Sequence, residues 1–141
     1  MNFLNEESRF VADTHALLWH FMDDSHLSTE ARRRLQLADR GEAIIYVSVM
    51  TSFEVQYLFE RGKISRRLWE NFFDLIRDDT RESYQLVSIE DTIVRAFQKI
   101  PIEAIPELPD RVITATSLHL GVPLITKDQR MHRWEGAVTI W

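Results

Sequence analysis

The chain of 141 residues has 17 Lys and Arg against 22 Asp and Glu, a net charge of −5, and 45% of its residues are hydrophobic. This composition is typical of one globular domain and excludes a disordered or fibrous chain, while the negative charge argues against holding nucleic acid by bulk electrostatics alone. The absence of cysteine excludes disulfides, thiolate metal ligands and cysteine nucleophiles.

Hydrophobic periodicity predicts that strands and helices alternate from the start of the chain. The first strand contains Phe10 and Val11 and runs directly into a helix, and Ser28 and Ser65 are the predicted N-caps of the second and fourth helices. In this first half of the chain the predicted strands are 9–13 and 43–49, and the predicted helices are 14–22, 29–41, 51–62 and 65–79.

The second half repeats this alternation around a connection that contains three prolines. The connection, 101–109, cannot continue a helix, and Gly121 ends the helix that follows it. The predicted strands here are 84–89, 122–126 and a short last one at 137–141, and the predicted helices are 90–100 and 110–121. Such an order favours an α/β domain with a mainly parallel sheet, which we expect to span 1–141 with its core at about 9–135.

Four acidic residues stand near the ends of the predicted strands. Asp13 ends the first strand, Glu54 lies on the helix after the second, Asp110 opens the helix after the proline-rich connection, and Asp128 follows the fourth strand. Parallel strands carry their carboxyl ends to the same edge of the sheet, where ligands bind, so we expect the four carboxylates to converge there. Individually they have simpler interpretations, as helix or turn caps or, for Glu54, as a solvated helix residue.

A converging set of carboxylates favours a divalent cation, because like charges so close together repel unless protons or cations intervene. The ions that suit an all-oxygen site are Mg²⁺ and Mn²⁺, and one or two of them would support attack of water on a phosphodiester. Basic side chains follow the fourth acid, and we interpret Lys127, Arg130 and Arg133 as candidate contacts to RNA phosphates.

Three segments resemble a known family. "FVADTHALLWHF" (10–21), "SFEVQYLFERGKI" (52–64) and "LPDRVITATSLHLGVPLITKDQRM" (108–131) are similar to the PIN-domain ribonucleases, and specifically to the VapC-type toxins of bacterial toxin–antitoxin pairs. The resemblance covers about residues 9 to 135. It implies a sheet sandwiched between helices, in a three-layer α/β/α arrangement.

The resemblance also implies the chemistry and the partners. It implies a Mg²⁺- or Mn²⁺-dependent endoribonuclease acting on structured RNA, tRNA or ribosomal RNA, which dimerises and is held inactive by a small antitoxin. The positions that match the family's acidic quartet are Asp13, Glu54, Asp110 and Asp128, and Thr126 matches a position near the metal site.

Two alternative functions remain open from the sequence. A metal-dependent phosphatase or DNA nuclease could use the same acids, and a non-catalytic protein could keep the fold and bind RNA or a partner. For location, no stretch is long and apolar enough to span a membrane, and the acidic N-terminus lacks the basic and apolar regions of a signal peptide. We therefore expect a cytoplasmic protein.

Overall fold

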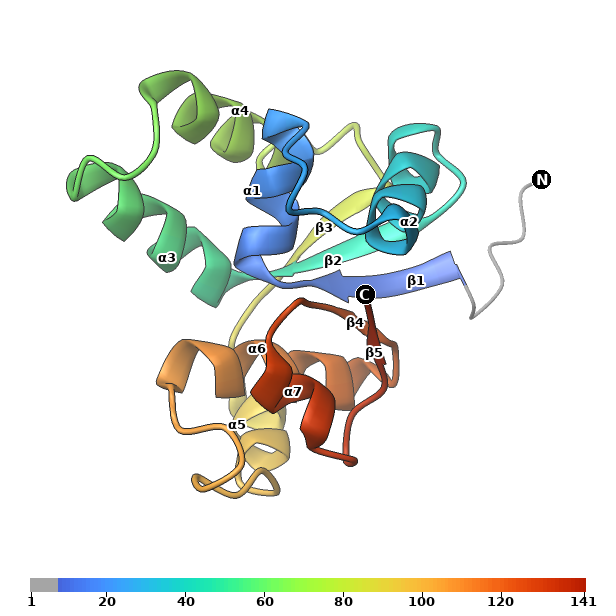
Figure 1. The fold of residues 1–141 in the computed structure, drawn as a ribbon, viewed down its shortest axis with the longest axis vertical. Coiled ribbons are helices and arrows are strands. Elements are labelled where there is room, and N and C mark those ends of the chain that lie inside the picture. The colour runs from blue at the N-terminus through green and yellow to red at the C-terminus, as the bar shows by residue number, and fades with distance from the viewer. Residues whose placement is uncertain (1–7) are drawn as a thin grey trace.

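The computed structural model describes residues 8–141 and is built around one sheet of five parallel strands (Figure 1). Residues 1–7, which carry most of the N-terminal segment used to predict that the chain has no signal peptide, lie outside the described residues. The strand order across the sheet is β3, β2, β1, β4, β5. The strands are β1 (Arg9–Ala12), β2 (Ile44–Ser48), β3 (Tyr84–Val87), β4 (Leu124–Ile125) and β5 (Thr139–Ile140).

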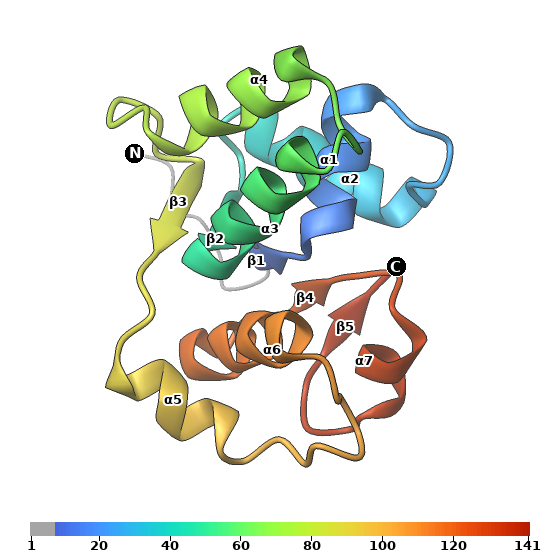
Figure 2. The same ribbon diagram turned by 90° about the vertical axis from the view of Figure 1, so that its left-hand side faces the viewer.

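Two layers of helices enclose this sheet, as Figures 1 and 2 show, with α1 to α4 on one side and α5 to α7 on the other. The expected three-layer α/β/α arrangement with a parallel sheet is thereby confirmed. No helix in the described part of the chain is long and apolar enough to cross a membrane. The helices are α1 (Thr14–Met22), α2 (Thr29–Asp39), α3 (Val49–Glu60), α4 (Arg66–Ile76), α5 (Asp91–Phe97), α6 (Leu108–Leu120) and α7 (Gln129–Arg133).

The central strand β1 contributes side chains to both hydrophobic cores. Phe10 and Ala12 pack into the core beneath α1, α2 and α4, whereas Val11 packs into the core beneath α5 and α6. This alternation follows from the two-residue period of a strand, whose successive side chains point to opposite faces. All three side chains are at most 1% exposed, so β1 is held rigidly at the centre of the molecule.

Side-chain caps fix where the helices begin on the α1 to α4 side of the sheet. The predicted caps are confirmed, since Ser28 Oγ accepts from Ala31 N and Ser65 Oγ accepts from Leu68 N, both at 3.1 Å. Ser48 ends β2 and caps α3 in the same way. These caps satisfy backbone N–H groups that have no partner within the helix.

Helix α6 begins earlier than predicted. Its first residue is Leu108 with Pro109 second, so Asp110 lies in the first turn and is not the N-cap. Proline is tolerated here because the first N–H groups of a helix have no partner inside it. Gly121 ends α6 with φ of 67°, as predicted.

Other boundaries differ by a few residues from the predicted ones. Helix α3 begins at Val49 because Ser48 already provides its cap, and α5 ends at Phe97. The predicted strand 122–126 shortens to β4, which pairs with only two residues of β1 and two of β5. The connection after α5 is held by Arg111, whose guanidinium lies 3.9 Å from the Phe97 ring centroid and donates to Ile100 O at 3.0 Å.

Candidate active site at the carboxyl edge of the sheet

Asp13 lies at the centre of this edge, between β1 and α1. Its side chain is 7% exposed; Oδ1 accepts from the Thr14 N–H at 2.7 Å, so Asp13 caps α1. Burial raises the pKa of Asp13, and nearby Asp128 raises it further, although the hydrogen bond from Thr126 and the neighbouring His15 oppose this. A carboxylate in such surroundings is stabilised by a nearby cation.

Thr126 connects two of the predicted acids. Its buried hydroxyl donates to Asp13 Oδ2 at 2.8 Å and accepts from the backbone N–H of Asp128 at 3.0 Å. Because Thr126 directly follows β4 and Asp13 directly follows β1, the parallel pairing of these strands brings the two side chains together. The hydroxyl therefore fixes the orientation of the Asp13 carboxylate.

Asp128 lies at the start of α7 and acts as its N-cap. Oδ1 accepts from the backbone N–H groups of Arg130 at 2.8 Å and Met131 at 3.2 Å. Oδ2 accepts no hydrogen bond from any residue in 8–141. The capping interpretation is therefore correct for Asp128, and one of its oxygens stays available to a ligand.

Glu54 reaches the same edge from the second turn of α3. Its Oε1 accepts a 2.7 Å hydrogen bond from the hydroxyl of Thr14, the residue after Asp13. Burial raises the pKa of Glu54, which is opposed by the Thr14 hydrogen bond and increased by the nearby Asp13. The sequence interpretation missed Thr14 as a linking residue, although its place beside Asp13 in "DTH" was a usable signal.

Asp110 shows most directly that the four acids share one region. The pKa of Asp110 is raised to about 7 by burial and, in decreasing order, by the charges of Asp13, Asp128, Glu54 and Glu107. Coulombic effects of this kind require short separations, so the other three acids of the set all lie within electrostatic reach of Asp110. Its carboxylate accepts no hydrogen bond from residues 8–141.

The donor set fits a hydrated divalent cation. No three of the His, Asp and Glu side chains in the described part of the chain are grouped closely enough to enclose an ion by themselves. Mg²⁺ does not need such a cage, because it keeps several waters and takes one or two carboxylates directly. The side chains that would hold it are those of Asp13, Glu54, Asp110 and Asp128, all of them oxygen donors.

The basic residues after the fourth acid separate onto two sides of α7. The Lys127 ammonium lies 5.6 Å from the centroid of the Trp19 ring, on the side of α1. Arg130 and Arg133 are exposed and face the connection between α5 and α6, where both line a cavity. These three candidate phosphate contacts therefore do not form a single patch.

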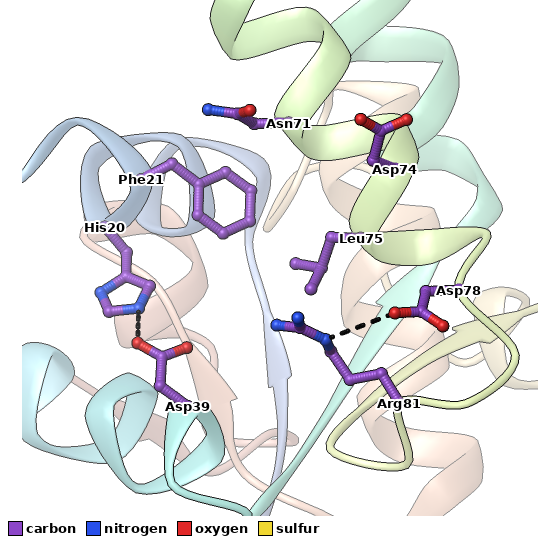
Figure 3. A pocket seen from close by; sticks show the side chains of 8 residues that line it. All are labelled: His20, Phe21, Asp39, Asn71, Asp74, Leu75, Asp78 and Arg81. Atoms are coloured by element: carbon purple, nitrogen blue, oxygen red, sulfur yellow. Dashed lines mark hydrogen bonds and ion pairs between the residues drawn. The ribbon is translucent and has the colours of Figure 1, made fainter.

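A second cavity, of about 460 Å³, lies between α1, α2 and α4 and contains none of the four acids (Figure 3). His20 Nε2 and Asp39 Oδ2 lie 2.7 Å apart across it, and Tyr84 donates to Asp39 Oδ1 at 2.6 Å. Burial would raise the pKa of Asp39, but these two hydrogen bonds hold it below its ordinary value. The cavity is lined by His20, Phe21, Asp39, Asn71, Asp74, Leu75, Asp78 and Arg81.

The sequence of this fold matches the family model described as "PIN domain" over residues 10–136. The chain belongs to the PIN-domain family. Among curated proteins this PIN-domain chain is similar to Ribonuclease VapC22 of Mycobacterium tuberculosis, with 26% identity over 137 residues that cover 93% of this chain and 97% of the relative. The resemblance of the three sequence segments to this family is thereby confirmed.

Solved structures share the fold of this PIN-domain protein. VapBC2 of Rickettsia felis, bound to a promoter DNA fragment, gives a TM-score of 0.66 at 14% identity, covering 94% of this chain and 97% of that one. DNA-bound VapBC of Salmonella typhimurium gives 0.63 at 14% identity, covering 94% and 96%. A toxin–antitoxin complex from Klebsiella pneumoniae gives 0.61 at 17% identity, covering 93% and 95%. At these identities the similarity establishes the fold.

Proposed function

We propose that this PIN-domain protein is a divalent-metal-dependent endoribonuclease and the toxin of a type II toxin–antitoxin pair. The observation that carries the proposal is the environment of Asp110, whose pKa is raised to about 7 by burial and by the other acids at the same sheet edge. Such a cluster at the ligand-binding edge of a parallel sheet suits Mg²⁺ or Mn²⁺. The similarity to Ribonuclease VapC22 supports RNA as the substrate class.

Each residue of the site has a proposed role. Asp13, Asp110 and Asp128 hold the metal, and Glu54 either holds it or orients the attacking water. One or two Mg²⁺ or Mn²⁺ ions held there would make hydroxide available near neutral pH and would offset charge on the leaving oxygen. The protein's own part is positioning, which phosphoryl transfer needs more than covalent chemistry.

Two threonines provide that positioning. Thr126 holds Asp13 through its 2.8 Å hydrogen bond, in the supporting role that outer-shell groups have around metal ligands. Thr14 holds Glu54 at 2.7 Å. Both hydroxyls are buried, so the orientations they impose are protected from competition with water.

The substrate and partners complete the proposal. We assign structured RNA, tRNA or ribosomal RNA, as the substrate, with Lys127, Arg130 and Arg133 contacting its phosphates. A small antitoxin inhibits the protein, which acts as a homodimer in the cytoplasm. The solved toxin–antitoxin complexes that share this fold support the antitoxin.

The test is cleavage of purified tRNA and ribosomal RNA in Mg²⁺, Mn²⁺ or EDTA, with single- and double-stranded DNA and a phosphomonoester in parallel. We expect cuts at discrete RNA sites that require the metal. Cleavage of DNA or of the phosphomonoester alone would identify the DNA nuclease or phosphatase alternative. Metal-independent RNA binding without any cleavage would identify a non-catalytic protein.

A further inference from the structure

A cavity of about 420 Å³ lies between α7 and the connection that leads into α6. Each of these two segments adjoins an acid of the candidate site, since Asp128 is the N-cap of α7 and Asp110 lies in the first turn of α6, just after the connection. The cavity is therefore next to the site but contains none of its four acids. Its lining residues are Glu103, Ala104, Pro106, Arg130, Arg133 and Trp134.

Two guanidinium groups give this cavity a positive charge, which the Glu103 carboxylate offsets only in part. Arg130 and Arg133 are three positions apart on α7, which places them on neighbouring parts of the helix surface. Both are exposed, and neither forms an ion pair or a side-chain hydrogen bond with residues 8–141. Their donors are therefore available to an anion.

The other basic run of the chain is different. On α2, Arg32 pairs with Asp23, and Arg33 and Arg34 pair with Glu30 at 3.0 and 2.8 Å. Those positive charges are offset within the protein, as is common on a solvated helix surface. By contrast, Arg130 and Arg133 on α7 have no acidic partner among residues 8–141 and can bind an anion close to the four acids.

Trp134 adds an aromatic surface to the same cavity. Its backbone N–H donates to Arg130 O at 3.2 Å at the end of α7, and its indole packs partly against the core beneath α6. A Cβ at position 136 would overlap the six-membered ring of Trp134, so Gly136 allows the ring to lie against the backbone. The indole N–H makes no hydrogen bond within the described residues, which leaves it free for a ligand.

We propose that this cavity binds one nucleotide of the RNA strand beside the scissile phosphate, which rests on the proposed function. Arg130 and Arg133 bind its phosphate, and guanidinium groups suit this because their donors match phosphate oxygens in pairs. The base stacks on Trp134, as bases do on aromatic side chains in single-stranded RNA sites. The Glu103 carboxylate accepts a hydrogen bond from the base or the 2′-hydroxyl. A volume of this size is in the usual range of ligand pockets.

The experiment measures binding separately from cleavage. Fluorescence anisotropy follows a fluorescein-labelled single-stranded RNA 12-mer of mixed sequence, in EDTA, with all proteins carrying Asp110→Asn. Arg133→Gln and Trp134→Leu are each expected to weaken binding about tenfold, the size expected for one charged contact or one stacked base. For Arg133→Gln the slope of log affinity against log salt should fall by about 0.7.

Two control variants make the result specific. Arg9→Gln removes one exposed charge at the amino end of β1, on the opposite edge of the sheet, and should change binding less than twofold. Trp134→Phe keeps an aromatic ring and should recover most of the affinity that Trp134→Leu loses. Thermal unfolding checks that the Trp134 variants remain folded. If they do not, the test rests on Arg133→Gln, because Arg133 is exposed and its replacement should not disturb the fold.

The outcomes separate this proposal from the proposed function. Equal binding by Arg133→Gln and Arg9→Gln, or no RNA binding by the parent protein, overturns the nucleotide site. Metal-dependent RNA cleavage by the unmodified protein is measured in parallel, and its result tests the proposed function independently of the binding experiment. If the unmodified protein cleaves RNA but the variants bind it equally, the nucleotide site is wrong and the ribonuclease activity stands. If the protein does not cleave RNA but the variants bind as expected, the cavity binds a nucleotide and the ribonuclease proposal is wrong.

Discussion

The Thr126 hydroxyl donates to Asp13 Oδ2 at 2.8 Å, which links the residue after β4 to the residue after β1 across 113 positions of sequence. The contact depends on the parallel neighbours β1 and β4, whose carboxyl ends reach the same edge. The same hydroxyl oxygen also accepts a hydrogen bond from the backbone N–H of Asp128. Thr126 is thus the structural connection between two of the four acids.

Replacing Thr126 by valine should weaken both the fold and the metal site. The buried Asp13 carboxylate loses a hydrogen bond, which should cost about 2 kcal/mol in the free energy of unfolding. The pKa of Asp13 should rise further, since the Thr126 hydrogen bond lowers it. Urea unfolding at pH 7 and a Mn²⁺ titration measure the two effects. The matched control is Thr116→Val, which removes a buried hydroxyl bonded only to Val112 O in its own helix; an equal loss of metal affinity there would contradict this role.

Asp110 should make the metal-free protein less stable as the pH rises. Its pKa is raised from 3.8 to about 7, so between these values the folded state binds more protons than the unfolded state. The free energy of unfolding contributed by this group is therefore highest at low pH and falls as the pH rises through this window. In EDTA, Asp110→Asn should be more stable than the wild type at pH 8, by on the order of 2 kcal/mol, since one pKa unit corresponds to about 1.4 kcal/mol and solvent screens part of the effect.

Urea unfolding at pH 4, 6 and 8 measures this difference. Most of the difference should disappear at pH 4, because the Asp110 carboxyl is then neutral in the folded state and only about half ionised in the unfolded state. A variant that is equally stable or less stable at pH 8 would show that the carboxylates do not repel one another as described.

When the metal binds, the Asp110 carboxyl should release a proton at pH 6 and almost none at pH 8. The Asp110 carboxyl is mostly protonated below its pKa of about 7 and must lose its proton to ligate a cation. Calorimetry of Mn²⁺ binding in buffers with different ionisation enthalpies counts the released protons. The same titration should raise the melting temperature of the wild type, because a ligand present at 100 times its Kd contributes about 2.7 kcal/mol. Proton release that is unchanged in Asp110→Asn would exclude Asp110 as the titrating ligand.

Two serine substitutions should change stability in opposite directions. Ser65 caps α4 through a 3.1 Å hydrogen bond, so Ser65→Ala should cost about 1 kcal/mol in the free energy of unfolding. The Ser52 hydroxyl on α3 is buried without a hydrogen-bond partner among the described residues. Ser52→Ala should therefore be neutral or stabilising by up to about 1 kcal/mol, because it removes an unsatisfied polar group. Chemical denaturation measures both, and a destabilised Ser52→Ala would indicate a partner for that hydroxyl.

The sequence was most informative where local chemistry decides the structure. The strand of Phe10 and Val11, the caps Ser28 and Ser65 and the terminating Gly121 are local signals, and the structure confirms each of them. The start of α6 was predicted two residues late, because Pro109 was interpreted as a helix breaker although the first turn tolerates proline.

Contacts between distant segments could not be predicted in the same way. The hydrogen bond from Thr14 to Glu54 joins α1 to α3 and depends on how the two helices pack. The separation of Lys127 from Arg130 and Arg133 likewise depends on the direction of α7, which five residues of sequence do not specify. Strand order could suggest an edge where acids gather, but the raised pKa of Asp110 depends on burial as well as on the neighbouring charges.

The central claim is that the four acids form a metal-dependent site that cuts RNA. Its most direct test compares cleavage of the same RNA by the wild type, Asp110→Asn and Asp91→Asn at saturating Mn²⁺; Asp91 is an exposed acid that pairs with Arg95 on α5. The account predicts discrete cleavage by the wild type and Asp91→Asn, loss of at least about a hundredfold in rate for Asp110→Asn, as when one group that stabilises the transition state is removed, and no cleavage in EDTA. Equal cleavage by all three proteins, or cleavage that persists in EDTA, would contradict it.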